Sequence, residues 1–474
     1  MKKFRIFPWI LCICLLFSAI SVRADQSVSD PAAQGCYSLD AKRPLGGTQK
    51  LADTADAALL FELNTDTLVY SFNADGRIDP TGMVKLLTVL VALEKGALED
   101  VVTVKRSTLN TVMIGSVSAN LQAGEEISLK DLLYCIMVGS ANDACAVVAE
   151  HIGGTQEAFA QMLDEKAAEL GCTGSDFENA HGLSGTTQYS TARDLAKITA
   201  AGLENELFAQ MFCAEDYTVP ATNKSEERYI ITTNYMMSDL YTSKHLDKRL
   251  TGGKTAAASL TDRSLICTAE VGTSRYLCVL MSAEAQVSAD GFVVQRYGSF
   301  EETAAVLDYG FDNFRVCQVA DRDQTFAQYP VSGGSNDVSV RVEQDIFTML
   351  PVDMDPQLLS FQDVLDGSLL EAPIRAEQRV GSLVVSYDGI VLGVTPLTAI
   401  VAVAQEGTQI RPAPYQDAPQ AVKFDYKGLL VKIGIVLVAL LLLAALVLLI
   451  IRLVRTAKLR RLHRRRMRNR RRSR

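Results

Sequence analysis

Histidine and tryptophan are scarce in this chain of 474 residues, which has four His and one Trp. Its ten cysteines include no CxxC pair, and one of the four histidines is His463, near the C-terminus. Zinc sites are built from closely spaced Cys and His side chains. We therefore expect no metal site, and we predict no bound cofactor.

The cysteines also lack the dense, regular spacing of a disulfide framework. Eight of them follow residue 24, and several, such as Cys135 and Cys145, lie in apolar stretches with helical periodicity. Buried cysteines in a chain large enough to have a real core behave as small hydrophobic residues. We expect buried free thiols.

Acidic residues are absent from both ends of the chain. All 55 Asp and Glu lie within residues 25–427, which contain 29 Lys and Arg, so this part carries a net charge near −26. Such a surface repels polyanions. No nucleic-acid partner is expected, and the simplest role of the charge is solubility.

Residues 1–24 have the pattern of a signal peptide. Lys2, Lys3 and Arg5 precede an apolar stretch over residues 6–20, and small residues before position 25 suit a cleavage site after Ala24. The alternative is an uncleaved N-terminal anchor, although the stretch is short for a membrane span. We favour export with cleavage.

Residues 428–451 are predicted to form one transmembrane helix, because Lys432 is their only charged residue. Thirteen Lys and Arg follow in the tail, residues 452–474. The positive-inside rule places this tail in the cytoplasm and residues 25–427 outside the cell membrane. The tail could instead bind nucleic acid, but beside a span we favour contact with anionic lipid.

Composition divides the segment between these ends into two domains and their linkers. We read residues 25–45 as a linker and residues 406–427, which are rich in Pro, as a tether to the membrane. Residues 46–315 read as an α+β domain. Strand-like patterns over 57–72 and 263–281 flank helical patterns over 85–95, 129–136, 143–152 and 155–170.

Residues 316–405 contain short strand-like runs separated by Gly, Pro and Asp, which predicts a small all-β domain.

Three short segments of the α+β domain carry polar groups that can share one cleft. The first is the run from Asp79 to Lys85, in which Gly82 and Lys85 are three residues apart at the start of a predicted helix. Positions spaced in this way share a helix face. The second is Ser140-Ala141-Asn142, after an apolar helix, and the third is Lys254-Thr255-Ala256.

These segments, in this order, resemble the SxxK, SxN and KTG motifs of the serine-type D-alanyl-D-alanine carboxypeptidases, the low-molecular-weight penicillin-binding proteins. The resemblance runs over residues 50–405. It implies a transpeptidase-like domain, with a mixed antiparallel sheet and a helical subdomain, followed by the small β domain. It also implies that Lys85, Ser140 and Asn142 occupy catalytic positions, with Gly82 at the position of the nucleophile. Lys254, Thr255 and Ala256 occupy substrate-binding positions, of which the first two hold the substrate carboxylate.

Two departures from the family pattern affect the predicted function. Gly82 stands where the family has its nucleophilic serine, so Lys85 has no hydroxyl to activate. Ala256 stands where KTG has glycine, which adds a methyl group near the substrate backbone. Thr81 is about 100° away around the helix start, so it is a poor replacement for the serine.

Several roles stay open. Lys85 could hydrogen-bond Ser140 and Asn142 as a buried structural partner, and Lys254 could be a solvated lysine at a strand edge. His151 and His181 are expected to cap helices or to make core hydrogen bonds.

The favoured interpretation is a surface-retained, inactive relative of these carboxypeptidases, which binds a peptidoglycan stem peptide or a cell-wall enzyme. One alternative is an active carboxypeptidase that uses another hydroxyl, such as that of Ser140. The other is a membrane-anchored scaffold that acts through its β domain.

The predicted topology can be tested with protease added to intact spheroplasts. We expect loss of residues 25–427 and protection of the Arg-rich tail, because the positive-inside rule keeps the tail in the cytoplasm. Digestion of the tail in intact spheroplasts would contradict this orientation.

Overall fold

The computed structural model describes residues 39–407, except residues 42, 184–186, 241, 292 and 368. The predicted signal peptide, transmembrane helix and tail lie outside the described residues, as do most of the linker and the tether. Over the residues that are described, no helix has both the length and the apolar character that crossing a bilayer requires.

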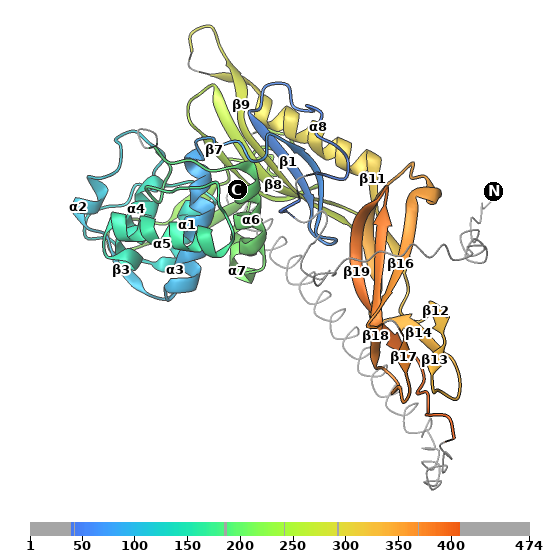
Figure 1. Cartoon of the computed structure of the whole chain (residues 1–474). Helices are drawn as coiled ribbons and strands as arrows, with labels where there is room; N and C mark the ends of the chain where they lie inside the picture. The colour runs from blue at the N-terminus through green and yellow to red at the C-terminus, as the bar shows by residue number, and fades with distance from the viewer. Residues whose placement is uncertain are drawn as a thin grey trace, which may run out of the picture. The chain divides into compact units, whose positions relative to one another are not determined.

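The α+β domain contains one large sheet and a group of helices (Figure 1). Its strands are β1 (Ala57–Glu62), β2 (Thr67–Phe72), β3 (Val101–Thr103), β4 (Glu126–Ser128), β5 (Asp216–Val219), β6 (Arg228–Ile231), β7 (Leu250–Ala257), β8 (Asp262–Val271), β9 (Ser274–Val287) and β10 (Val294–Tyr297). Its helices are the 3₁₀ turn η2 (Thr81–Met83), α1 (Val84–Lys95), α2 (Arg106–Leu109), α3 (Leu129–Met137), α4 (Asn142–Gly153), α5 (Gln156–Glu169), α6 (Ala192–Leu203), α7 (Glu206–Phe212) and α8 (Gly298–Asn313). The predicted helices correspond to α1, α3, α4 and α5 within two residues at each end.

Side-chain caps explain where several helices begin. Ser128 accepts the backbone N–H of Asp131 at the start of α3, and Thr155 accepts that of Ala158 at the start of α5. Such caps satisfy N–H groups that have no partner within the helix.

The large sheet is antiparallel, with the strand order β2-β1-β9-β8-β7 and with β10 paired to the end of β9. Within this sheet β7 is an edge strand. The edge position matters because β7 carries the third predicted site segment, Lys254–Ala256.

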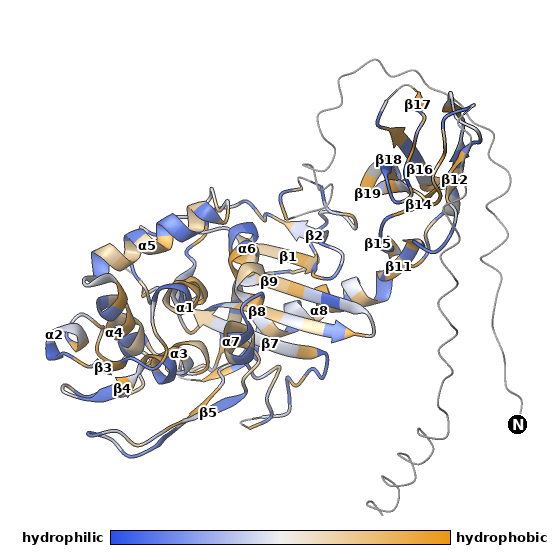
Figure 2. Cartoon of the chain, turned by 90° about the horizontal axis from the view of Figure 1, so that it is seen from below, coloured by the Kyte–Doolittle hydropathy of each residue, from blue (hydrophilic) through white to orange (hydrophobic). Residues whose placement is uncertain are grey.

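Both faces of this sheet are buried. Alternate residues of β1 contact different cores: Leu59 and Phe61 belong to the core shared with α1, whereas Leu60 belongs to the core beneath α8. On β9, Leu277 belongs to the core shared with α1, and Tyr276 belongs to the core beneath α8. Because successive side chains of a strand point to opposite faces, helices must cover the sheet on both sides. The central strands accordingly carry mostly hydrophobic colours in Figure 2.

The second domain is all-β. Its strands are β11 (Phe314–Ala320), β12 (Ala327–Tyr329), β13 (Val331–Ser332), β14 (Val338–Val342), β15 (Ile346–Pro351), β16 (Leu359–Leu365), β17 (Leu370–Glu371), β18 (Arg379–Tyr387) and β19 (Ile390–Ala399), with one 3₁₀ turn, η3 (Pro356–Leu358). The main sheet has the order β12-β14-β19-β18-β16, and two-stranded pairs form between β11 and β15 and between β13 and β17. Val340, Leu383 and Leu397 are fully buried in its core. The predicted α+β domain followed by a β domain is confirmed.

The seven cysteines that the structure describes are free, and five of them are buried. The prediction of buried thiols is wrong for Cys213, which is exposed, and for Cys317, which is partly exposed. Within the described ranges, His, Cys, Asp and Glu side chains form no group of three that could hold a metal ion.

Glu302 on α8 anchors the segment that leads into β1. Its buried carboxylate accepts the backbone N–H of Thr54 at 3.0 Å, the hydroxyl of Thr54 at 2.6 Å and the N–H of Ala55 at 3.0 Å. Replacing it would leave these donors without partners. We expect Glu302→Ala to lower the free energy of unfolding by about 3 kcal/mol, measured by denaturant titration.

Glu301→Ala is the matched control, because Glu301 is a neighbouring exposed residue that pairs with Arg296. It should change stability by less than about 0.5 kcal/mol. Equal losses in the two variants would show that the hydrogen bonds of Glu302 do not anchor this segment.

Candidate active-site cleft

The three predicted site segments meet at one place in the α+β domain. Gly82 lies in η2, which leads directly into α1, and Ser140 lies in the turn before α4. Lys254–Ala256 belong to β7, which packs against η2. The start of one helix, the start of another and a sheet edge therefore form a shared cleft.

Position 82 faces the amine of Lys85. A Cβ atom placed on Gly82 would lie 3.2 Å from Lys85 Nζ and 3.4 Å from the Ala256 methyl carbon. The first distance is tight, but Nζ is the end of a flexible side chain. A serine therefore fits at position 82 and would have its Cβ beside the amine. In this chain that place has no side chain.

Lys85 is held by the backbone. Its Nζ donates a hydrogen bond to the carbonyl oxygen of His181 at 2.5 Å, and its side chain is almost fully buried. The alternative that Lys85 pairs with Ser140 and Asn142 is wrong. The Ser140 hydroxyl accepts from Lys254, and Asn142 Oδ1 has no hydrogen-bond partner among the described residues.

Two residues of the cleft have strained backbones. Thr81 has φ 48° and Ser140 has φ 58°, both in the left-handed region. Such conformations cost about 1–3 kcal/mol and gather at functional sites. Gly182 (φ +73°) supports the first, since a Cβ there would lie 1.7 Å from the carbonyl oxygen of Thr81. The cleft thus has a strained turn immediately before position 82.

Lys254 is buried, so the alternative of a solvated edge lysine is wrong. Its Nζ donates to the Ser140 hydroxyl at 2.9 Å and to the Thr255 carbonyl at 3.2 Å. The Thr255 hydroxyl lies 2.5 Å from that of Thr233. Asn142 is buried, and its Oδ1 has no hydrogen-bond partner within the described chain.

Two buried lysine amines lie in the cleft, and burial disfavours the charged form of each. Burial, and after it the charge of Lys85, lowers the pKa of Lys254 to about 7. Burial also lowers the pKa of Lys85. Among the described residues, neither amine forms an ion pair with a carboxylate. A ligand carboxylate could supply the missing negative charge.

Neither nearby titratable group acts as a base in this arrangement. Burial, and then the charge of Lys85, lowers the pKa of His181 to about 4, and its Nδ1 accepts the N–H of Leu183 at 3.1 Å. Burial raises the pKa of the Cys145 thiol to about 11, although both lysines oppose this. His151 lies elsewhere, 3.2 Å from Asp100.

Two contributors were missed by sequence reasoning. The first is the backbone carbonyl of His181, which accepts the hydrogen bond of Lys85. Because it is a backbone atom, no residue type in the sequence indicates this contact. The role of Asp143 in holding the loop before β4 was also not foreseen: its carboxylate accepts the Ser118 hydroxyl at 2.6 Å and the N–H groups of Ala119 and Leu121 at 2.8 and 3.0 Å.

A small hollow of about 160 Å³ lies beside the third segment. Thr233, Thr255 and Ala256 line one part of it, and Arg263 and Tyr297 line another. Polar hydroxyls and the Arg263 guanidinium therefore lie next to the edge strand, which is a place where an extended peptide can add to a sheet.

Comparisons with known proteins agree with this geometry. A family described as D-alanyl-D-alanine carboxypeptidase matches residues 46–285, and one described as penicillin-binding protein 5, C-terminal domain, matches residues 314–405. The chain is 28% identical to D-alanyl-D-alanine carboxypeptidase DacF of Bacillus subtilis, over 74% of this chain and 86% of that protein. It is 26% identical to DacA of Escherichia coli, over 73% and 83%.

Solved structures show the same fold. The crystal structure of penicillin-binding protein 5 from Haemophilus influenzae covers 76% of this chain and all of its own length, with a TM-score of 0.59 and 25% identity. The matched segments include η2, α4 and β7, which together form the cleft. By its matched sequence and its fold, this chain belongs to the D-alanyl-D-alanine carboxypeptidase family, with a penicillin-binding protein 5 C-terminal domain behind the carboxypeptidase domain.

Proposed function

We propose that this chain is a non-catalytic member of the family, which binds peptidoglycan stem peptides reversibly in its cleft. The observation that carries the proposal is the bare position beside Lys85: a Cβ at Gly82 would lie 3.2 Å from the amine, but glycine offers no hydroxyl. Covalent acyl transfer requires a nucleophile at that place.

The size of the expected loss supports this proposal. Removing the serine from a covalent serine mechanism costs on the order of 10⁶ in kcat, and on the order of 10³–10⁴ over the uncatalysed reaction remains. Trimming of cell-wall peptides at such a residual rate would be negligible.

Neither neighbouring hydroxyl is a good substitute for the serine. Thr81 is almost fully buried, and its Oγ1 has no hydrogen-bond partner among the described residues, so no base is in place to take its proton. The Ser140 hydroxyl accepts from Lys254, and Lys85 donates to the His181 carbonyl, so no hydrogen bond joins Ser140 to Lys85 among the described residues. An active carboxypeptidase that uses another hydroxyl is therefore the less favoured function.

Binding needs no nucleophile. Lys254 and Thr255 lie on the edge strand, and the unpaired Oδ1 of Asn142 is a free acceptor for an amide N–H. These groups suit a peptide with a terminal carboxylate. The Ala256 methyl narrows the cleft beside Gly82, and the acidic surface weakens long-range attraction of anions. We therefore propose weak affinity.

Location and partners belong to the same proposal. A signal peptide, one span over residues 428–451 and a basic cytoplasmic tail would hold the cleft at the outer surface of the cell membrane. A cell-wall enzyme is the alternative partner, and a scaffold that acts through its β domain is the alternative function.

Fluorescent penicillin tests the loss of catalysis. We expect no covalent labelling of the full-length protein, because position 82 has no hydroxyl. Gly82→Ser should gain labelling that survives denaturation, since the new Cβ would lie beside Lys85 Nζ. Adding Ala256→Gly should increase the labelling, because it removes the methyl group next to position 82.

Gly82→Ala is the matched control, since it adds the same Cβ without a hydroxyl and should remain unlabelled. Labelling of the unaltered protein at Thr81 or Ser140 would refute the proposed loss of catalysis. A folded double variant that stays unlabelled would show that the cleft has diverged beyond these two positions.

A stem-peptide mimic, N-acetylated and ending in D-Ala-D-Ala, tests ligand binding to the full-length protein. We expect millimolar affinity, about −4 kcal/mol, measured by saturation-transfer NMR on the peptide. Lys254→Ala should abolish the signal. Affinity should fall as the pH rises above about 7, because only the protonated amine of Lys254 pairs with the carboxylate.

Lys248→Ala is the control, because Lys248 is exposed and lies just before β7. It should leave binding unchanged. If no signal appears at several millimolar peptide, the cleft is not a receptor site and the scaffold function is favoured.

A further inference from the structure

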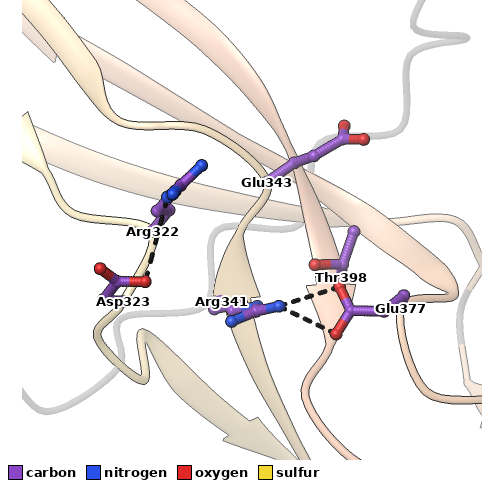
Figure 3. A pocket seen from close by; sticks show the side chains of 6 residues that line it. All are labelled: Arg322, Asp323, Arg341, Glu343, Glu377 and Thr398. Atoms are coloured by element: carbon purple, nitrogen blue, oxygen red, sulfur yellow. Dashed lines mark hydrogen bonds and ion pairs between the residues drawn. The ribbon is translucent and has the colours of Figure 1, made fainter. Parts of the chain in front are cut away.

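The β domain contains a second pocket, of about 290 Å³, which is separate from the cleft (Figure 3). It is lined by Arg322, Asp323, Arg341, Glu343, Glu377 and Thr398. Arg341 on β14 and Thr398 on β19 are direct cross-strand partners. The pocket therefore rests on the main sheet of this domain, with the other residues coming from adjoining loops.

Thr398 provides a polar group without a partner. The residue is 5% exposed, and its Oγ1 has no hydrogen-bond partner within the described part of the chain. Buried hydroxyls are normally hydrogen-bonded. In Figure 3 this side chain lies beside the Arg341–Glu377 pair at the pocket. A molecule in the pocket could satisfy this hydroxyl.

Two arginines of the pocket have donors to spare. Arg341 directs Nη2 at both oxygens of Glu377, at 2.9 and 3.0 Å. Its Nε and Nη1 form no hydrogen bond with any described residue. Arg322 has only a distant carboxylate, that of Asp323, with 3.9 Å between Nε and Oδ1. A guanidinium with unused donors is a good site for a ligand carboxylate.

Glu343 provides the opposite charge. Glu343 lines the pocket, and its carboxylate, which points away from the Arg341–Glu377 pair in Figure 3, forms no ion pair with the described residues. A cationic nitrogen of a ligand could pair with it. The pocket thus presents spare groups for a carboxylate and for an ammonium.

The charge balance selects among ligand classes. Two Arg face three acidic residues, so the pocket is slightly negative within an acidic chain. A polyanion would be repelled, and a simple cation would leave the arginine donors unused. A ligand that carries one positive and one negative charge has no net charge to be repelled, and its negative group can use the arginine donors. The volume lies at the lower end of the range for ligand sites, which suits a molecule of about dipeptide size.

We propose that this pocket binds a short zwitterionic peptide, with its carboxylate on Arg322 and Arg341, its ammonium on Glu343 and a polar group on Thr398. The proposal uses no residue of the cleft, so it stands whether or not the cleft binds stem peptides. The β domain is then a second recognition site for free peptide ends.

The test uses D-alanyl-D-alanine and the full-length Lys254→Ala variant, in which the cleft lysine is absent. Saturation-transfer NMR should detect binding of the dipeptide. Arg341→Ala, made in this variant, should weaken binding about tenfold or more, because a charge-assisted bidentate contact is lost. Arg315→Ala is the control, because Arg315 is exposed on β11 and does not line the pocket.

Thr398→Val separates binding from folding. It removes a hydroxyl that has no partner in the free protein, so it should weaken dipeptide binding several-fold without lowering the Tm. The amide of the dipeptide lacks the carboxylate, and N-acetyl-D-alanyl-D-alanine lacks the ammonium. Both should bind more weakly than the zwitterion.

Two comparisons complete the experiment. Preference for D-alanyl-D-alanine over L-alanyl-L-alanine would indicate a peptide derived from the cell wall, and equal binding would indicate peptide ends in general. Both results support a zwitterion site. Dipeptide binding that Arg341→Ala leaves unchanged, no dipeptide binding, or binding of inorganic phosphate in place of the dipeptide would overturn the proposal.

Discussion

The cleft depends on the burial of two lysine amines that have no carboxylate partner in the described structure. An unpaired buried cation is costly, and it is retained only where other groups stabilise it or where its pKa falls. Both responses occur here. The His181 carbonyl holds Lys85, the Ser140 hydroxyl and the Thr255 carbonyl hold Lys254, and burial lowers both pKa values.

The surroundings of position 82 are built by backbone packing as well as by the lysines. The η2 turn packs against β7, Thr81 and Ser140 have left-handed backbones, and Gly182 leaves room for the carbonyl of Thr81. The Ala256 methyl lies beside the empty position. The η2 turn, the start of α4 and β7 thus form one cleft, and position 82 within it is glycine.

The two domains present different recognition chemistry. The cleft combines amines and a free amide oxygen at a sheet edge, whereas the pocket of the β domain balances guanidinium and carboxylate groups over a buried hydroxyl. Both arrangements suit peptide ends. A protein that recognises cell-wall peptides without cleaving them has use for both kinds of site.

The amino-acid sequence by itself determined the α+β domain, the β domain behind it and the identity of the three site segments, because these follow from periodicity and from short motifs. It also determined that position 82 lacks a hydroxyl. Only the tertiary structure decided that Lys254 bonds Ser140 while Lys85 bonds the backbone of His181, since a choice between acceptors depends on distances across the cleft. The pocket around Arg341 and Thr398 likewise arises only when β14 and β19 pair, because 57 residues separate these two positions in the chain.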